Sequence, residues 1–158
     1  VLSEAMNSIN ENFGRIFKEL FGGGKASISF ADPDDMIDGD VDITAQPPGK
    51  TVNSIQLLSG GERSLISISL YFAMIAVSPT PFCIMDEIES ALDDINVDRF
   101  AQYARNFCDR TQFIMITHRR GTMNVADVLY GITMQEKGIS KYLTISVDEV
   151  EKKLGIKL

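Results

Sequence analysis

Two short, uninterrupted apolar runs constrain the fold of this chain more than any other feature of its sequence. The runs are Phe82–Met85 and Phe113–Ile116, and an amphipathic stretch with helical periodicity, Ile95–Cys108, lies between them. A continuous apolar run of this length is typical of a buried parallel strand. A strand, a helix and a second strand at this spacing form a βαβ unit. We therefore expect an α/β fold with a mainly parallel core sheet and flanking helices.

The segment before this unit predicts one helix and one hairpin. Apolar residues alternate at intervals of four and three, as in a coiled-coil seam or in a helix docked on a globular core. The series is Leu2, Met6, Ile9, Phe13, Ile16 and Leu20. Gly22–Gly24 then end the predicted helix. Alternating apolar residues in Ala26–Phe30 and Val41–Ala45 predict two strands joined by an Asp-rich loop.

The remaining patterns complete an α/β domain. We expect a helix over Glu62–Val77, ended by prolines, and a hairpin of strands near Leu129–Gln135 and Lys141–Ile145. A capping box of Ser146 and Glu149 predicts a final helix.

Charge and hydropathy limit the classes of function. The chain carries 22 acidic and 15 basic residues, a net charge of −7, and six aspartates lie between residues 32 and 42. Phosphate backbones are bound by clustered Lys and Arg, so a large nucleic-acid surface on this chain is not expected. No apolar run approaches the about 20 residues that span a bilayer, and nothing resembles a signal peptide. We expect no membrane partner.

The first motif with chemical content is Ser59-Gly60-Gly61-Glu62, at the start of a predicted helix. Adjacent glycines let a ligand approach the backbone, the helix N-terminus presents free N–H groups, and Ser59 adds a hydroxyl donor. That combination suits a phosphate group. The same residues also suit a plain helix N-cap, and Ser-Gly-Gly alone does not decide between the two.

Two acids and the only histidine follow the two apolar strands. Asp86 and Glu87 end the first strand, and His118 follows the second. The carboxyl ends of parallel strands are where open α/β sheets bind ligands. In P-loop NTPases an acid at this place holds Mg²⁺, and a further group orients the attacking water. Surface acids and a structural histidine are the plain alternative.

These motifs, together with Ser90–Asp93, occur in the order of the signature motif, Walker B, D-loop and switch histidine of ABC ATPases. The chain resembles that superfamily. Longer strings narrow the resemblance to SMC chromosome-organising proteins, with bacterial chromosome-partition SMC as the nearest member. The strings are Phe13–Gly24, Pro81–Glu87, Ala91–Val97, Ile116–Met123, Ala126–Gly131 and Met134–Glu136. The chain departs from the family at Arg63, where Lys is common, and at Glu89-Ser90, in place of Asp-Ala.

The resemblance implies the C-terminal half of an SMC ATPase head, entered by the end of a coiled-coil helix. Residues 1–21 would end the returning coiled-coil arm, and residues 22–158 would form the C-terminal head lobe. A complete head needs a phosphate-binding Gly-x-x-x-x-Gly-Lys-Ser/Thr motif. The candidate Gly22–Ala26 fails, because alanine lacks the hydroxyl and these glycines end a helix. In SMC proteins that motif lies in an N-terminal segment, so we expect the isolated chain to be inactive.

In such a head, two lobes and two heads would hold ATP and Mg²⁺ jointly. The resemblance implies that Asp86 binds Mg²⁺ through water, that Glu87 is the general base and that His118 assists. Residues that would contact ATP held by a second head, in trans, are Ser59, Gly60, Gly61, Glu62 and Asp93. Hydrolysis would release the heads, move the coiled-coil arms and act on entrapped DNA. This work would serve chromosome condensation and segregation in the cytoplasm, at the nucleoid.

The resemblance also implies a kleisin partner (ScpA-like), whose winged-helix domain docks against the last strands of the head. Alternation along the last strand places Leu143, Ile145 and Val147 toward the core and Tyr142 toward solvent. Tyrosine is a favoured interface anchor, so Tyr142 is the expected kleisin contact.

Two other kinds of protein stay open at the level of sequence. One is a different ABC ATPase: a transporter's nucleotide-binding domain, a RecF- or RecN-like repair protein, or the SMC-like break-repair ATPase. A transporter domain would carry its phosphate-binding motif in the same short chain. The other is a non-catalytic scaffold, a degenerate ATPase half, which the intact Ser59, Asp86, Glu87 and His118 argue against.

Overall fold

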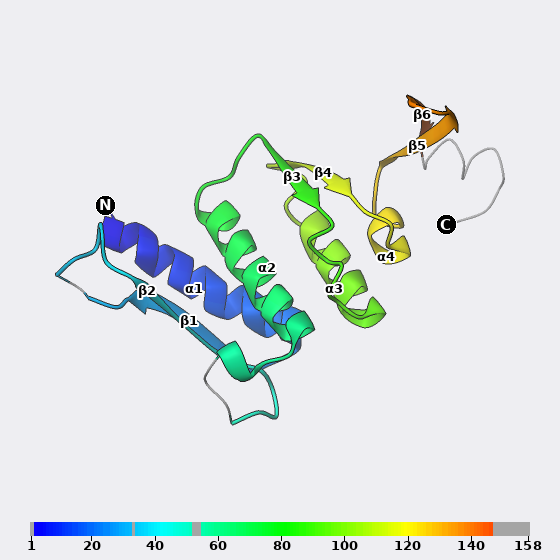
Figure 1. Cartoon of the computed structure of the whole chain (residues 1–158). Helices are drawn as coiled ribbons and strands as arrows, with labels where there is room; N and C mark the ends of the chain where they lie inside the picture. The colour runs from blue at the N-terminus through cyan, green and yellow to red at the C-terminus, as the bar shows by residue number, and fades with distance from the viewer. Residues whose placement is uncertain (1, 33, 52–54, 147–158) are drawn as a thin grey trace.

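Helices and strands follow one another along the chain largely as the sequence predicts (Figure 1). The computed structural model describes residues 2–32, 34–51 and 55–146. The helices are α1 (Leu2–Phe21), η1 (Ile55–Leu57, a 3-10 helix), α2 (Gly60–Val77), α3 (Asp94–Arg105) and α4 (Arg120–Met123). The strands are β1 (Lys25–Phe30), β2 (Val41–Gln46), β3 (Phe82–Asp86), β4 (Gln112–Ile116), β5 (Val128–Glu136) and β6 (Ile139–Ser146). The final helix predicted after Ser146 lies outside the described residues.

The predicted βαβ unit is confirmed. Strands β3 and β4 pair in parallel, from Phe82 opposite Gln112 to Asp86 opposite Ile116, and α3 connects them. Aromatic rings join this unit to α2: Phe72 lies 6.0 Å from Phe100 of α3 and 6.2 Å from Phe113 of β4, measured between ring centroids. The inner face of the strand pair is therefore part of the hydrophobic core.

The outer face of this strand pair is not covered. Phe82, Ile84, Ile114 and Ile116 are 45–59% exposed, whereas Cys83 and Met85 on the inner face are buried. The expectation that both apolar runs form buried strands is thus wrong for one of their two faces. Strand pairs β1–β2 and β5–β6 are antiparallel. Among the described residues, β3–β4 is the one parallel pair, so these residues do not contain a mainly parallel core sheet.

The first helix packs into the same core with its C-terminal half. Phe13, Ile16, Phe17 and Leu20 are buried, while Leu2 near the other end is exposed. Figure 1 shows α1 between the β1–β2 hairpin and α2, both of which it contacts. The alternating apolar series therefore serves globular packing over residues 13–20. Extension of α1 into a coiled-coil arm stays a prediction.

The glycines after α1 act as a helix terminator, as predicted. Gly22, Gly23 and Gly24 have φ angles of 72°, 145° and 84°, a region that residues with a Cβ rarely adopt. The Gly23 N–H donates to the Lys18 carbonyl at 2.8 Å, closing the end of the helix. A Cβ at Gly24 would lie 2.4 Å from the Gln46 carbonyl oxygen. These residues thus join α1 to β1 and do not begin a helix, as a phosphate-binding loop would.

Strands β5 and β6 form the predicted hairpin, which turns at Gly138 and extends beyond α4 (Figure 1). Tyr142 is 72% exposed, as expected. Leu143 on the opposite face is 61% exposed, so the prediction that it packs into the core is wrong. The hairpin exposes apolar residues on both of its faces. None of the described helices is both long enough and apolar enough to cross a membrane.

Candidate functional site

The signature segment begins α2 with a complete capping box. The Glu62 N–H donates to Ser59 Oγ at 3.3 Å, and the Ser59 N–H donates to Glu62 Oε2 at 2.9 Å. This geometry makes Glu62 the third residue of the helix, so Gly60 and Gly61 form its first turn instead of preceding it. A hydroxyl that accepts one bond still has its proton to donate. Ser59 can therefore cap the helix and donate to a phosphate oxygen at once.

A lysine fixes the acid of this box. Lys50 Nζ lies 2.8 Å from Glu62 Oε1 and 2.9 Å from Oε2. The hydrogen bond from Lys50, followed by the one from the Ser59 backbone, lowers the pKa of Glu62 below its ordinary value. Glu62 is thus held as a carboxylate that serves the cap, which is the role the structure shows for it.

The two glycines of the segment differ in their surroundings. A Cβ at Gly61 would lie 3.0 Å from the Ala91 carbonyl oxygen, so the start of α2 lies directly against the turn that precedes α3. A Cβ at Gly60 would meet no atom within 4 Å. A Cβ at Gly61 would therefore crowd the backbone of this turn. The backbone at Gly60 is open to approach from outside.

Asp86, Glu87 and His118 lie together at the carboxyl ends of β3 and β4. Asp86 pairs with Ile116, and the Glu87 N–H donates to the Ile116 carbonyl at 3.0 Å. His118 Nδ1 lies 3.4 Å from Glu87 Oε1, close enough for an ion pair when the imidazole is protonated. Both side chains are exposed. The carboxylate can accept a proton and the imidazole can donate a hydrogen bond, which are the two tasks expected at the end of this strand pair.

The backbone at Glu87 is unusual. Its φ of 49° is the one positive value at a non-glycine residue among the described positions. Such a conformation costs about 1–3 kcal/mol and persists only where surrounding contacts impose it. The Ser90 N–H donates to the Glu87 carbonyl at 3.0 Å, which closes a tight turn directly after β3.

Asp93 caps the next helix. Its Oδ1 accepts from the Asn96 N–H and its Oδ2 from Asn96 Nδ2, both at 2.9 Å. Both carboxylate oxygens thus have partners within the chain. A contact from Asp93 to a nucleotide on a second head stays a prediction.

Two residues that join these motifs escaped the sequence-based prediction of site residues. Glu89 is buried, and its Oε1 accepts from Thr117 Oγ1 at 2.5 Å and from Thr122 Oγ1 at 2.8 Å. Arg119 donates to the Leu92 carbonyl and to Asp94 Oδ1, both at 2.9 Å. The partners of Glu89 lie 28 and 33 residues away along the chain. No local pattern joins residues so far apart, and only the departure from the family pattern at Glu89 marked the position.

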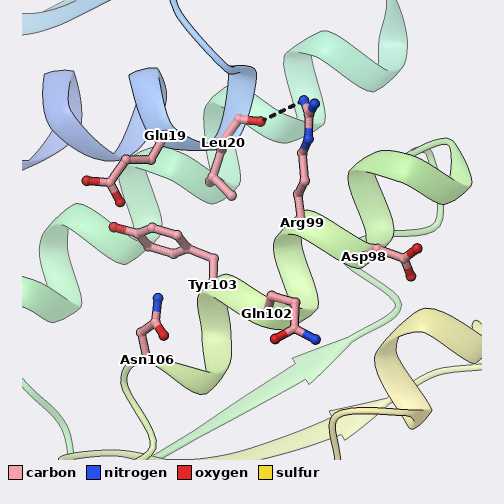
Figure 2. Close-up of a pocket in the computed structure, with 7 residues that line it drawn as sticks. All are labelled: Glu19, Leu20, Asp98, Arg99, Gln102, Tyr103 and Asn106. Carbon is pink, nitrogen blue, oxygen red and sulfur yellow. Dashed lines mark hydrogen bonds between the residues drawn. The ribbon is translucent and has the colours of Figure 1, made fainter.

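A hollow on the described surface lies elsewhere. A cavity of 410 Å³ opens between the end of α1 and the outer side of α3, and its lining includes Leu20, Arg99 and Tyr103 (Figure 2). Arg99 donates to the Leu20 carbonyl at 3.4 Å there, and burial raises the pKa of Tyr103 to about 12. None of the predicted site residues lines it. The motif residues instead lie on an open surface.

Asp86 offers a group that suits Mg²⁺, and the start of α2 separately offers groups that suit a phosphate. No three His, Cys, Asp or Glu side chains in the described part of the chain are grouped as a metal cluster. Magnesium does not need such a cluster, because it is commonly bound by one or two carboxylates together with substrate phosphates and water. The exposed carboxylate of Asp86 meets that requirement, and the N-terminus of α2 offers N–H groups and a hydroxyl to phosphate oxygens.

Residues 6–141 match the family model described as RecF/RecN/SMC N terminal domain. The chromosome partition protein Smc of Bacillus subtilis (strain 168) is 51% identical over 144 residues, which are 91% of this chain and 12% of the relative. The protein of the same name from Desulfitobacterium hafniense (strain Y51) is 53% identical over 149 residues, 94% of this chain and 12% of the relative. The chain thus spans about an eighth of the length of these relatives.

Solved structures share the fold. A structure described as the SmcHead bound to the C-winged helix domain of ScpA has a TM-score of 0.86 at 37% identity, with 93% of this chain and 45% of that chain covered. One from work on ATP-driven dimerization and DNA stimulated activation of SMC ATPases has a TM-score of 0.83 at 36% identity, with 96% and 92% covered. The SMC head domain from Thermotoga maritima gives 0.69 at 34% identity, with 92% and 51% covered.

Proposed function

Because this chain belongs to the RecF/RecN/SMC N terminal domain family and has the fold of an SMC ATPase head, we propose that it is the C-terminal lobe of the head of a chromosome partition protein. Relatives at 51–53% identity are chromosome partition proteins, which favours this function over repair or transport ATPases. In the proposed protein, residues 1–21 end a coiled-coil arm and residues 22–158 form the lobe.

One observation carries the proposal of a half-head. Parallel sheets occur almost only where both of their faces are covered, yet the outer face of β3–β4 exposes four large apolar side chains. The predicted site residues at the end of that sheet are exposed as well. An N-terminal lobe with the phosphate-binding motif would cover this face and complete the sheet. It would also place ATP beside Asp86, Glu87 and His118.

In the completed head, the predicted site residues that follow would each have one role. Asp86 holds Mg²⁺, which when bound neutralises charge on the phosphates. Glu87 accepts a proton from the attacking water, and His118 donates a hydrogen bond beside it. Ser59, with the N–H groups of Gly60 and Gly61, contacts ATP held by a second head. Hydrolysis releases the two heads and moves the arms around entrapped DNA.

The first test is complementation. We expect the isolated chain to show no ATP binding by calorimetry and no phosphate release above background, because it lacks a phosphate-binding loop. Addition of the N-terminal lobe is expected to restore both, with the lobe alone as the control. Turnover by the chain without that lobe would rule out a half-site. A completed head that binds ATP but never hydrolyses it would favour the alternative of a non-catalytic scaffold protein.

We also propose that Tyr142 contacts a kleisin partner. A similar solved head is described as bound to a winged-helix domain of ScpA. Tyr142 lies directly opposite Ile132 in the β5–β6 hairpin, and the two exposed side chains share one face. An exposed aromatic beside an exposed aliphatic residue suits a partner of this kind.

We expect Tyr142→Lys to weaken capture of the kleisin winged-helix domain by at least about tenfold in a pull-down titration, as loss of an interface anchor does. The thermal melt is expected to stay unchanged, since Tyr142 buries little within the chain. Leu143→Lys is the matched control, because Leu143 is similarly exposed but lies on the opposite face. Unaltered capture by Tyr142→Lys would remove this residue from the interface.

A further inference from the structure

A buried carboxylate bonds to the segment that carries His118, one member of the candidate catalytic pair. Glu89 is 2% exposed, although acidic side chains are almost never fully buried unless they are paired. Its side chain accepts from the hydroxyls of Thr117 and Thr122, and both donate to the same oxygen, Oε1. The roles proposed above for Asp86, Glu87 and His118 make no use of this group.

The two threonines lie on either side of His118. Thr117 Oγ1 also accepts from the Arg119 N–H at 3.0 Å, so the residues directly before and after the histidine are tied to one hydroxyl. That hydroxyl in turn donates to Glu89. Thr122, which is buried in α4, anchors the following turn to the same oxygen. The segment that carries His118 is therefore held at both ends by Glu89.

At its own end, Glu89 belongs to the turn that carries Glu87. This turn is closed by the Ser90 N–H donating to Glu87 and continued by the Leu92 N–H donating to the Glu89 carbonyl at 2.9 Å. The positive φ of Glu87 shows that this turn is held in a costly conformation. A buried anchor two residues away is the kind of contact that can impose it.

We propose that Glu89 is a positioning residue, which holds the Thr117–Thr122 segment against the Glu87 turn and thereby keeps His118 within 3.4 Å of Glu87. Glu89 touches no reacting atom and acts through the pair. The effect on turnover rests on the proposed ATPase function. The effect on the position of His118 does not depend on it.

Glu89→Leu removes the carboxylate acceptor and places an apolar side chain of similar size in the buried site. In the head reconstituted with its N-terminal lobe, we expect kcat to fall about 10- to 100-fold, since misplacing a reacting group by about 1 Å costs up to about 100-fold. The KM for ATP is expected to change by less than about threefold, because ground-state binding is not touched. Thr117→Val removes one of the two hydroxyls that bond Glu89, at a position that is less buried than Glu89. This variant is also expected to lower kcat.

The decisive measurement is a double-mutant cycle. If Glu89 acts through the pair, Glu89→Leu is expected to cost less than about threefold in a His118→Ala background. An equal loss of kcat in both backgrounds would overturn the proposal, as would an unchanged kcat in a variant with an unchanged melt. Should Glu89→Leu fail to fold, the cycle with Thr117→Val decides by the same criterion. The control is Glu136→Gln, which cuts the exposed ion pair to Lys141 on the β5–β6 hairpin and is expected to leave kcat within about twofold.

A spectroscopic readout separates this proposal from the proposed function. His118 is the only histidine of the chain, so histidine labelling of this chain alone gives one assigned imidazole. We expect its proton and nitrogen resonances, at one fixed pH, to shift in Glu89→Leu and in Thr117→Val but not in Glu136→Gln. If the unmodified head proves unable to hydrolyse ATP, the ATPase proposal fails and these spectra still test the positioning. Unshifted resonances in both variants would overturn it.

Discussion

Replacement of Glu87 by glutamine is expected to lower ATP turnover of the completed head by about 10²- to 10⁴-fold, while ATP-bound head dimers accumulate. Glutamine keeps the length of the side chain and can still form hydrogen bonds, but it cannot accept a proton from water. Glutamine has the same unbranched Cβ as glutamate, so the positive φ at this position is equally tolerated. Binding of nucleotide and of Mg²⁺ through Asp86 is expected to persist.

Phosphate release and light scattering in the presence of ATP measure the two effects separately. Glu136→Gln is the matched control, since it removes the same charge from an exposed position on β5 and is expected to leave turnover within about twofold. Glu87→Gln heads that stay monomeric with ATP, or that hydrolyse at the unmodified rate, would show that Glu87 is not the base.

Ser59→Arg is expected to abolish ATP-dependent dimerisation of heads and to leave ATP binding by the same head intact. The physical reason is that Ser59 faces outward at the start of α2, where its hydroxyl proton is available to a nucleotide on another head. A long cationic side chain there would block the approach of a second head to the open backbone at Gly60. Calorimetry with ATP and light scattering give the two readouts.

Loss of the helix cap is a separate consequence of this substitution. Arginine cannot accept the Glu62 N–H bond, which costs about 0.5–2 kcal/mol of stability, so we also expect a lower melting temperature. Ser67→Arg is the control, because it adds the same charge and bulk to an exposed position of α2, one turn or more beyond the capping box. If Ser59→Arg heads lose nucleotide binding but still dimerise, the assignment of Ser59 to the trans site is wrong.

Much of the chain's local structure could be predicted because local rules govern it. The apolar runs of β3 and β4, with a helix between them, required a parallel pair, and β3–β4 is parallel. Three consecutive glycines had to end α1, since nothing else in the chain tolerates such φ values as readily. The start of α2 was misplaced by two residues. The capping box needs Glu62 at the third helical position, and this draws both glycines into the helix.

The candidate site was predictable only in part. Motif order alone placed Asp86, Glu87 and His118 at adjacent strand ends, because parallel pairing brings those ends together. The contacts that position these residues were not predictable. Glu89 meets Thr117 and Thr122 across about thirty residues of chain, and Gly61 lies against Ala91 from another motif. Such contacts depend on how α2, α3 and α4 pack, which no local period encodes.

By itself, then, the sequence determined which described segments are helices and strands, where glycine ends them and which side chains are candidates for the chemistry, because each depends on neighbours within a few residues. Only the tertiary structure decided which apolar faces are covered. Phe82 and Ile84 alternate with Cys83 and Met85 in one apolar run, yet only the latter pair is buried. Leu143 read as a core residue and is exposed. A hydrophobic pattern records that a face avoids water, whereas burial depends on which element packs against it.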